Sequence, residues 1–239
     1  MAPNMRIVLP VVAVLAVGGG AGVYFGTRQD PAPSAGGAVA TANAATPGGE
    51  LATTPPPAGQ EQNPLYAERV LGNPNAPVTV IEYSSLTCPH CANFHNNILP
   101  QLKADYIDTG KVKIVYRDFP FDRMALAGAM AARCLPADRY FPFVDILFRS
   151  QEQWTGGQDP QRALQQTARL AGLSEADFQA CVNNQDLGNW LLQRRLDAEK
   201  QYSVTSTPTF VINNGRDRIV GAQPADVFRQ ALDRALPRG

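Results

Sequence analysis

Two cysteines separated by two residues, where a predicted strand meets a predicted helix, constrain the fold of this chain more than any other feature. The motif is Cys88-Pro89-His90-Cys91. The apolar run 78–83 before it is typical of a strand, and apolar residues spaced by three and four positions after it predict a helix. Cys88 is therefore expected at the helix N-terminus, where unpaired backbone N–H groups and the helix dipole stabilise a thiolate.

The four residues of the motif have different expected roles. Cys88 is the expected nucleophile in disulfide exchange, and Cys91, one turn further along the helix, is the expected resolving thiol. Pro89 fits the first helical turn, where a missing N–H costs nothing. His90 offers a hydrogen-bond donor and partial positive charge beside the sulfur. A stabilised thiolate means a stabilised reduced form, so His90 is expected to make the disulfide a stronger oxidant.

A carboxylate precedes the motif on the predicted strand. Glu82 lies six residues before Cys88 and shares a strand face with Val80, because side chains alternate along a strand. It could therefore be buried beneath the helix and hold or relay the proton of Cys91 during exchange. An exposed carboxylate on an edge strand is the alternative, and the spacing alone does not decide between the two.

A structural zinc site is the alternative interpretation of the cysteine pair. Zinc takes four ligands, usually from two such pairs or from one pair with two histidines. The chain has two histidines, His90 and His95, and no second pair, since Cys134 and Cys181 stand alone. His90 lies inside the turn, and His95, one turn beyond Cys91, is expected on the helix surface. We therefore expect no metal and no cofactor besides the cysteine pair itself.

The N-terminal segment 1–25 predicts export from the cytoplasm. Arg6 precedes nineteen uncharged residues, 7–25, which as a helix would span about 28 Å, close to the hydrocarbon core of a bilayer. The positive-inside rule then keeps the N-terminus in the cytoplasm and exports the rest. We expect an uncleaved membrane anchor, and a cleaved signal peptide that leaves a soluble protein is the alternative.

The remaining chain divides by composition into a linker and one domain. Residues 26–64 are rich in Ala, Pro, Gly and Thr and predict a disordered tether. Residues 65–239 have a plausible length for a single domain. The 21 basic and 21 acidic residues balance, and no basic run indicates a nucleic acid partner.

The order of predicted elements defines the fold class. A second strand is predicted at 111–119, helices between about 122 and 202, strands at 209–212 and 218–220 with a hairpin turn at 213–215, and a final helix at about 224–236. A strand, helix, strand, helical block, strand, strand and helix, with the dithiol after the first strand, is the thioredoxin arrangement. The predicted class is α/β: a thioredoxin fold with an inserted helical domain between the second and third strands.

The chain resembles the DsbA-like family of exported thiol-disulfide oxidoreductases, in the thioredoxin superfamily. Residues 82–91 (E-Y-S-S-L-T-C-P-H-C) and 207–210 (T-P-T-F) carry the resemblance, which covers the folded region only. It implies that Cys88 is the nucleophile, that Cys91 is the resolving cysteine and that Glu82 is the buried acid beneath them.

The resemblance also implies a cis peptide bond before Pro208, facing the disulfide. A cis proline before a strand exposes the backbone of Thr207, which can pair with an extended substrate segment. Pro89, Thr207 and Pro208 are therefore the expected substrate-binding residues. An ordinary trans proline at the start of a strand is the alternative.

Cys134 and Cys181 each lie on the apolar face of a predicted helix. Buried free cysteines are common as small apolar residues. A leftover even pair in an exported protein usually bonds, and some members of the resembled family carry a second disulfide in this helical region. We therefore expect a structural Cys134–Cys181 disulfide.

The family implies a periplasmic enzyme, tethered to the inner membrane, that donates the Cys88–Cys91 disulfide to reduced, newly exported proteins. A DsbB-like, quinone-linked membrane partner would reoxidise it. The alternative is an isomerase or reductase kept reduced by another membrane partner, since thioredoxin-like isomerases also often carry threonine at the position of Thr207. No dimerisation domain is visible, so a monomer is expected. A redox-inert binding or chaperone module is a third possibility, which the intact dithiol opposes.

Overall fold

A computed structural model describes residues 54–237, and the segment predicted as anchor or signal, 1–25, lies outside them. The described residues form one mixed five-stranded sheet with strand order β1-β3-β2-β4-β5. Within 54–237 no helix combines the length and the apolar composition that crossing a membrane requires. The strands are β1 (Arg69–Leu71), β2 (Val78–Ser84), β3 (Val112–Asp118), β4 (Thr209–Ile212) and β5 (Asp217–Val220).

The helices fall into an active-site segment, an insertion and a C-terminal helix. The first comprises α1 (Pro89–Asn93) and α2 (Leu99–Leu102), continued by π-helical turns at Phe94–Ile98 and Lys103–Ile107. The insertion between β3 and β4 holds α3 (Arg123–Cys134), α4 (Ala137–Arg149), α5 (Gln151–Thr155), α6 (Pro160–Leu170), α7 (Glu175–Val182) and α8 (Gln185–Tyr202). The last helix is α9 (Ala225–Ala235).

β2 lies at the centre of the sheet, which places the residues before the dithiol in the core. It runs parallel to β3, with Glu82 opposite Tyr116, and antiparallel to β4, with Glu82 opposite Phe210. The edge strand β1 pairs antiparallel with β3. It was not predicted, because its three residues are too few to show a periodic pattern.

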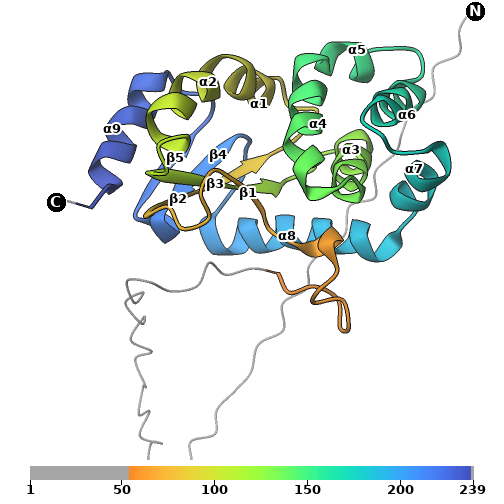
Figure 1. Cartoon of the computed structure of the whole chain (residues 1–239), viewed down its shortest axis with the longest axis horizontal. Coiled ribbons are helices and arrows are strands. Elements are labelled where there is room, and N and C mark those ends of the chain that lie inside the picture. Colours follow the sequence, from red (N-terminus) through yellow and green to blue (C-terminus); the bar gives the residue numbers. More distant parts are fainter. Residues whose placement is uncertain (1–53, 238–239) are drawn as a thin grey trace, which may run out of the picture. The chain divides into compact units, whose positions relative to one another are not determined.

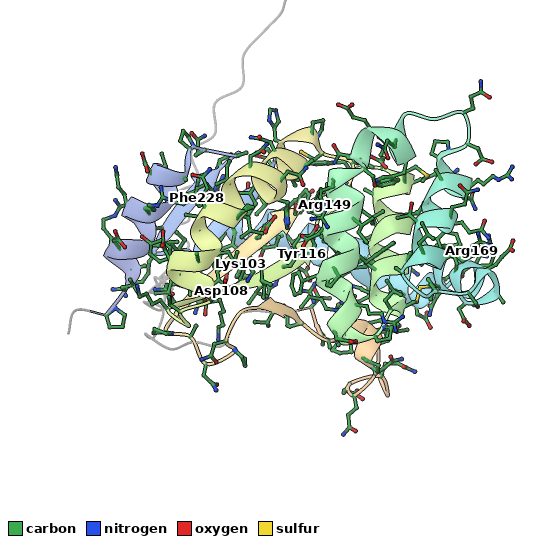
Figure 2. All side chains as sticks on the ribbon, turned by 45° about the horizontal axis from the view of Figure 1, so that its top comes forward. Lys103, Asp108, Tyr116, Arg149, Arg169 and Phe228 are labelled. Carbon is green, nitrogen blue, oxygen red and sulfur yellow. A yellow bond between two sulfur atoms is a disulfide. The ribbon has the colours of Figure 1, made fainter. Side chains whose placement is uncertain are left out.

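Helices cover both faces of the sheet (Figure 1). On one face the active-site helices and α9 bury an apolar cluster that includes Val80, Phe94, Phe210 and Phe228. On the other face α8 packs through Ala198. The insertion has its own apolar core, which meets the sheet at Tyr116 (Figure 2). The observed architecture is the α/β thioredoxin fold with a helical insertion that the sequence predicts.

Side-chain caps begin most helices of the insertion. Each cap accepts a hydrogen bond from a backbone N–H that has no partner inside its helix, which typically stabilises a helix by about 1 kcal/mol. The caps are Asp122, Asp159, Ser174 and Asn184, before α3, α6, α7 and α8.

The end of the segment predicted as a disordered tether is ordered against the domain. Trp190 on α8 donates its indole N–H to the backbone carbonyls of Thr54 (3.3 Å) and Pro55 (3.0 Å). The Thr54 hydroxyl donates to Asp197 on the same helix at 2.6 Å. The boundary placed at residue 64 was therefore wrong, because these contacts involve backbone groups that composition does not reveal. Residues 26–53 of the predicted tether lie outside the described residues.

Candidate active site

The strand-to-helix junction places Cys88 at the cap of α1. β2 ends at Ser84, and the Cys88 N–H donates to the Ser85 carbonyl at 3.0 Å. The backbone of Cys88 is extended, Pro89 occupies the first helical position, and the Ala92 N–H donates to the Cys88 carbonyl at 3.1 Å. The Cys88 sulfur thus lies beside backbone N–H groups that have no partner within the helix.

Two polar residues of the insertion hold this junction in place. The buried Gln151 of α5 donates to the carbonyls of Leu86 (2.7 Å) and Cys88 (3.0 Å). The Thr87 hydroxyl donates to Asp122, the cap of α3, at 2.6 Å. Sequence reasoning missed both contacts, because nothing in the local pattern links these positions to the motif.

Both motif cysteines are free thiols, and their environments differ. Cys88 is half-buried. The Cys91 thiol, Thr207 and the backbone N–H groups of Cys91 and His90 hydrogen-bond its sulfur. They lower the pKa of Cys88 to about 5, against the opposing effect of partial burial. A thiol with this pKa is ionised at neutral pH, so Cys88 has the properties of a nucleophile.

Cys91 has the opposite character. Its side chain is fully buried, and burial raises the pKa of the Cys91 thiol well above its ordinary value. The hydrogen bond and the negative charge of Cys88 raise it further, while the Ser84 hydroxyl and the Ser85 N–H act in the other direction. Cys91 therefore holds its proton at neutral pH.

The contribution of His90 differs from the expectation. Its backbone N–H hydrogen-bonds the Cys88 sulfur, because it lies in the first turn of α1. Its imidazole is exposed, and among the described residues no hydrogen bond joins that ring to the sulfur. The expected donor is thus present, but in this geometry it belongs to the main chain.

The residues expected to bind substrate lie on both sides of the Cys88 sulfur. The Thr207–Pro208 peptide bond is cis, as the family resemblance implies. The Cys88 sulfur lies 3.4 Å from the Thr207 carbonyl oxygen, to which the protonated thiol donates. Pro89 is exposed on the helix side. The turn before β4 therefore flanks the reactive sulfur with a backbone segment.

Glu82 and His95 form a buried pair beneath the helix. Glu82 is fully buried on the central strand, so the edge-strand alternative is wrong. His95 Nε2 donates to Glu82 Oε1 at 2.9 Å. The expectation that His95 lies on the helix surface was also wrong, because its ring is buried on the same face as Cys91, four residues before it. That spacing is α-helical, and only the polarity of histidine favours the surface.

Aromatic rings and a second carboxylate surround His95. Its ring stacks on Phe148 of α4 at a centroid distance of 4.3 Å. Its Nδ1 lies 3.8 Å from a carboxylate oxygen of Asp145, also on α4. Burial disfavours the charged ring, but Glu82 and Asp145 outweigh burial and raise the pKa of His95 to about 9. His95 is therefore an imidazolium at neutral pH.

The other two cysteines form a disulfide that connects α3 and α7. The structure bonds Cys134 to Cys181, with a Cα–Cα distance of 6.3 Å. Cys181 is buried and Cys134 is half-buried. In residues 54–237 no group of three or more His, Cys, Asp and Glu side chains is arranged to hold a metal ion.

Comparisons with known proteins agree with this geometry. The family model described as Thioredoxin matches residues 66–234. A protein of Rickettsia typhi named as a protein-disulfide oxidoreductase is 32% identical over 170 residues, which are 71% of this chain and 62% of the relative. The chain thus spans less than two thirds of that relative's length. Disulfide bond formation protein D of Bacillus subtilis is 25% identical over 163 residues, 64% of this chain and 71% of that protein.

Solved structures give the same result. Wolbachia pipientis alpha-DsbA1 is 32% identical with a TM-score of 0.65, and the match covers 70% of this chain and 90% of that one. A protein-disulfide isomerase of Novosphingobium aromaticivorans is 29% identical with a TM-score of 0.60, covering 70% and 97%. From the family match, the dithiol at the strand-to-helix junction and the cis proline beside it, this chain belongs to the thioredoxin family and is one of its DsbA-like members.

Proposed function

We propose that this protein is an exported thiol-disulfide oxidoreductase that donates the Cys88–Cys91 disulfide to reduced proteins. The observation that carries the proposal is the asymmetry of the two thiols. The pKa of Cys88 is lowered to about 5, whereas the pKa of the buried Cys91 is raised. A low pKa at the accessible Cys88 sulfur stabilises the reduced form of the protein, so its disulfide readily oxidises the thiols of a substrate.

The exchange proceeds in two displacements. A substrate thiolate attacks the Cys88 sulfur of the disulfide, and Cys91 leaves and takes up a proton. A second substrate thiolate then attacks the substrate sulfur of the mixed disulfide, and Cys88 leaves as a stable thiolate. The substrate loses two electrons and forms its disulfide. The turn at Thr207–Pro208 offers the backbone against which an extended substrate segment would lie.

The export predicted from the sequence supports the proposed direction. Thiol–disulfide oxidants work where disulfides persist, outside the cytoplasm, and the Cys134–Cys181 bond belongs to such an environment. The proposed export signal consists of Arg6 and the apolar run 7–25, which would act as an inner-membrane anchor or as a cleaved signal peptide. The proposed partners are reduced periplasmic proteins and a DsbB-like membrane protein that restores the disulfide, with this protein acting as a monomer.

The reduction potential of the Cys88–Cys91 pair tests the proposal. The full chain is equilibrated with glutathione buffers of graded potential, quenched with acid, alkylated and analysed by mass spectrometry. We expect a potential less negative than about −180 mV, the value of a protein disulfide isomerase. A Cys134→Ala/Cys181→Ala variant serves as the control that assigns the signal to the motif. A value near about −270 mV, as in thioredoxin, would contradict an oxidase.

An isomerase is the second candidate. The Novosphingobium aromaticivorans structure carries the name protein-disulfide isomerase, and Thr207 precedes the cis proline in this chain. The two candidates differ in the state that reacts, because an isomerase attacks with its reduced Cys88 and an oxidase donates its disulfide. In refolding of a reduced substrate protein, the oxidised chain is expected to form disulfides and Cys88→Ala to form none. Full function of Cys88→Ala would instead support a redox-inert binding module.

A further inference from the structure

Four arginine side chains lie buried at the junction of the sheet with α3 and α8. They are Arg69, Arg117, Arg133 and Arg194, and none is more than 5% exposed. Among residues 54–237, ion pairs join these guanidinium groups to two carboxylates, those of Glu68 and Asp118. Buried charges are normally paired with opposite charges, so the described part of this cluster carries an excess of positive charge.

Glu68 is shared between two of these arginines. One of its oxygens lies 2.8 Å from an Arg194 nitrogen and 3.5 Å from an Arg117 nitrogen. Burial lowers the pKa of Arg194, and the charges of Arg133 and Arg117 lower it further, against the opposing effect of Glu68. A second carboxylate beside Arg117 and Arg194 would therefore offset the repulsion between their charges.

A pocket of about 340 Å³ opens beside the same two arginines, on the face of the sheet that α8 covers. Three cationic side chains line it, those of Arg117, Arg194 and Lys200. Among the described lining residues, Asp197 is the one acid. The pocket therefore has the chemistry of an anion site, with room for a carboxylate side chain.

Asp197 is already engaged at the edge of this pocket. It accepts hydrogen bonds from the Thr54 hydroxyl at 2.6 Å and from Gln193 at 2.8 Å. The bond from Thr54 is the largest of the effects that lower the pKa of Asp197, which is therefore ionised at neutral pH. Asp197 and Glu68 together leave one of the three cationic charges unbalanced within the described chain.

The N-terminal segment of the same chain reaches the described structure at this pocket. Thr54 is the first described residue and itself lines the pocket. Figure 1 shows the start of the described chain, in orange, beside α8. The segment 1–53 contains two acidic residues, Asp30 and Glu50. Glu50 precedes Thr54 by four residues, which an extended chain spans in about 14 Å, whereas Asp30 precedes it by twenty-four.

We infer that the Glu50 carboxylate occupies this pocket as a counter-ion of Arg117 and Arg194. Glu50 lies outside the described residues, and its charge and its distance along the chain from Thr54 single it out as the occupant. The ion pair fastens the N-terminal segment to the α8 face of the sheet. Since the active-site helices cover the opposite face, this attachment leaves the Cys88 side open to partners. The inference concerns the tether and does not depend on the proposed exchange.

Carbodiimide cross-linking of the full chain, in nonionic detergent, tests the contact. The reagent joins a carboxylate to an amine that it touches, and mass spectrometry of the peptides identifies the pair. We expect Glu50 to be joined to Lys200, the lysine that lines the pocket, and Asp30 to stay unlinked. A Glu50 that is joined to any other lysine, or to none, would overturn the inference.

The stability of Glu50→Gln measures the strength of the ion pair. The change leaves Arg117 and Arg194 with one carboxylate between them. The folding equilibrium constant of the reduced full chain, from urea denaturation, is therefore expected to fall about tenfold. Asp30→Asn removes one negative charge from the same segment and is the matched control, which should leave the constant unchanged. Equal constants for wild type and Glu50→Gln would contradict the pairing.

Acetate distinguishes Glu50 from a dissolved anion as the occupant. A ligand that binds the folded state alone stabilises it, so acetate should stabilise a protein whose pocket is open. Relative to sodium chloride at the same concentration, sodium acetate is expected to raise the urea midpoint of Glu50→Gln and not that of the wild type. An equal rise in both proteins would show that the pocket is open in the wild type, and the inference would fail.

The redox reaction separates this inference from the proposed function. The rate at which glutathione reduces the Cys88–Cys91 disulfide is expected to be the same in wild type and Glu50→Gln, because the pocket lies on the other face of the sheet. A slower reaction in the variant would contradict the placement of Glu50. A reduction potential like that of thioredoxin in both proteins would instead refute the proposed oxidase and leave the ion pair standing.

Discussion

The two motif thiols show how strongly local contacts change the chemistry of one residue type. Cys88 and Cys91 lie three positions apart, yet the pKa of one is lowered and that of the other is raised. The cause is geometry: Cys88 caps α1 and meets N–H donors, whereas Cys91 lies one turn deeper and meets apolar neighbours. The lowered pKa of Cys88 follows from the motif and the helix start alone. The raised pKa of Cys91 depends on how the helix packs against the rest of the domain.

The lowered pKa of Cys88 predicts how the stability of the reduced protein depends on pH. Between about pH 5 and the unfolded thiol pKa of about 8.5 to 9, the unfolded chain binds a proton at Cys88 that the folded chain does not. Stability from this group is therefore complete above the unfolded pKa and is lost as pH falls through about 5. Relative to Cys88→Ala, the free energy of unfolding should rise with pH across this window, as measured by urea denaturation.

A variant and a spectroscopic measurement test the ionisation of Cys88 behind that prediction. A Cys91→Ala variant removes the thiol that contributes most to the lowered pKa of Cys88. The Cys88 thiolate should therefore appear at higher pH, and the pH range over which the unfolding free energy rises should narrow. Absorbance of the reduced protein at 240 nm reports the thiolate directly. A difference in unfolding free energy that stays flat between pH 5 and 8 would show that Cys88 ionises alike in the folded and unfolded chains.

His95 shows the limit of prediction at the residue scale. The sequence marks Glu82 as a candidate buried acid, because it alternates with valines on an apolar strand. It does not show that His95 is the partner of Glu82, although the spacing of His95 from Cys91 places both residues on one face of the active-site helix. The partner could have been anticipated from charge, because a buried carboxylate normally has a cationic or hydrogen-bonding neighbour.

At the scale of elements, the active-site junction depends on the insertion. The side chain of Gln151 on α5 donates hydrogen bonds to two carbonyls of the loop from Ser85 to Cys88. The order of strands and helices was predictable from periodicity and turn residues. The attachment of α5 to this loop was not, because the two segments are more than sixty residues apart in the sequence.

Gln151→Ala should therefore loosen the active site. The change leaves the Leu86 and Cys88 carbonyls without their donor, which is expected to cost about 1–3 kcal/mol of unfolding free energy. It should also speed the alkylation of the buried Cys91 in the folded, reduced protein. Gln153→Ala, exposed on the same short helix, is the matched control and should change neither value. Equal effects of the two variants would refute a holding role for Gln151.

At the scale of the whole molecule, the fold class was predictable because the dithiol occurs between a strand and a helix and the later strands carry clear turn signals. The start of the folded domain was less predictable. Residues 54–64 resemble a linker in composition, but Trp190 fixes the start of this segment by bonding its backbone carbonyls. Contacts of this kind link positions more than a hundred residues apart, and no local pattern encodes them.

The Cys134–Cys181 disulfide joins two helices of the insertion across a sequence separation of 47 residues. Closing a loop of that length reduces the entropy of the unfolded chain, which corresponds to about 4 kcal/mol of stabilisation in the chain-entropy treatment. A Cys134→Ala/Cys181→Ala variant should therefore lose about 2–4 kcal/mol of unfolding free energy, measured by urea denaturation with Cys88–Cys91 kept reduced. Each single substitution removes the same bond and should cost about as much as the double. A double variant as stable as the wild type would mean that the insertion packs without the bond, and that the unfolded chain is already compact enough for the crosslink to restrict little.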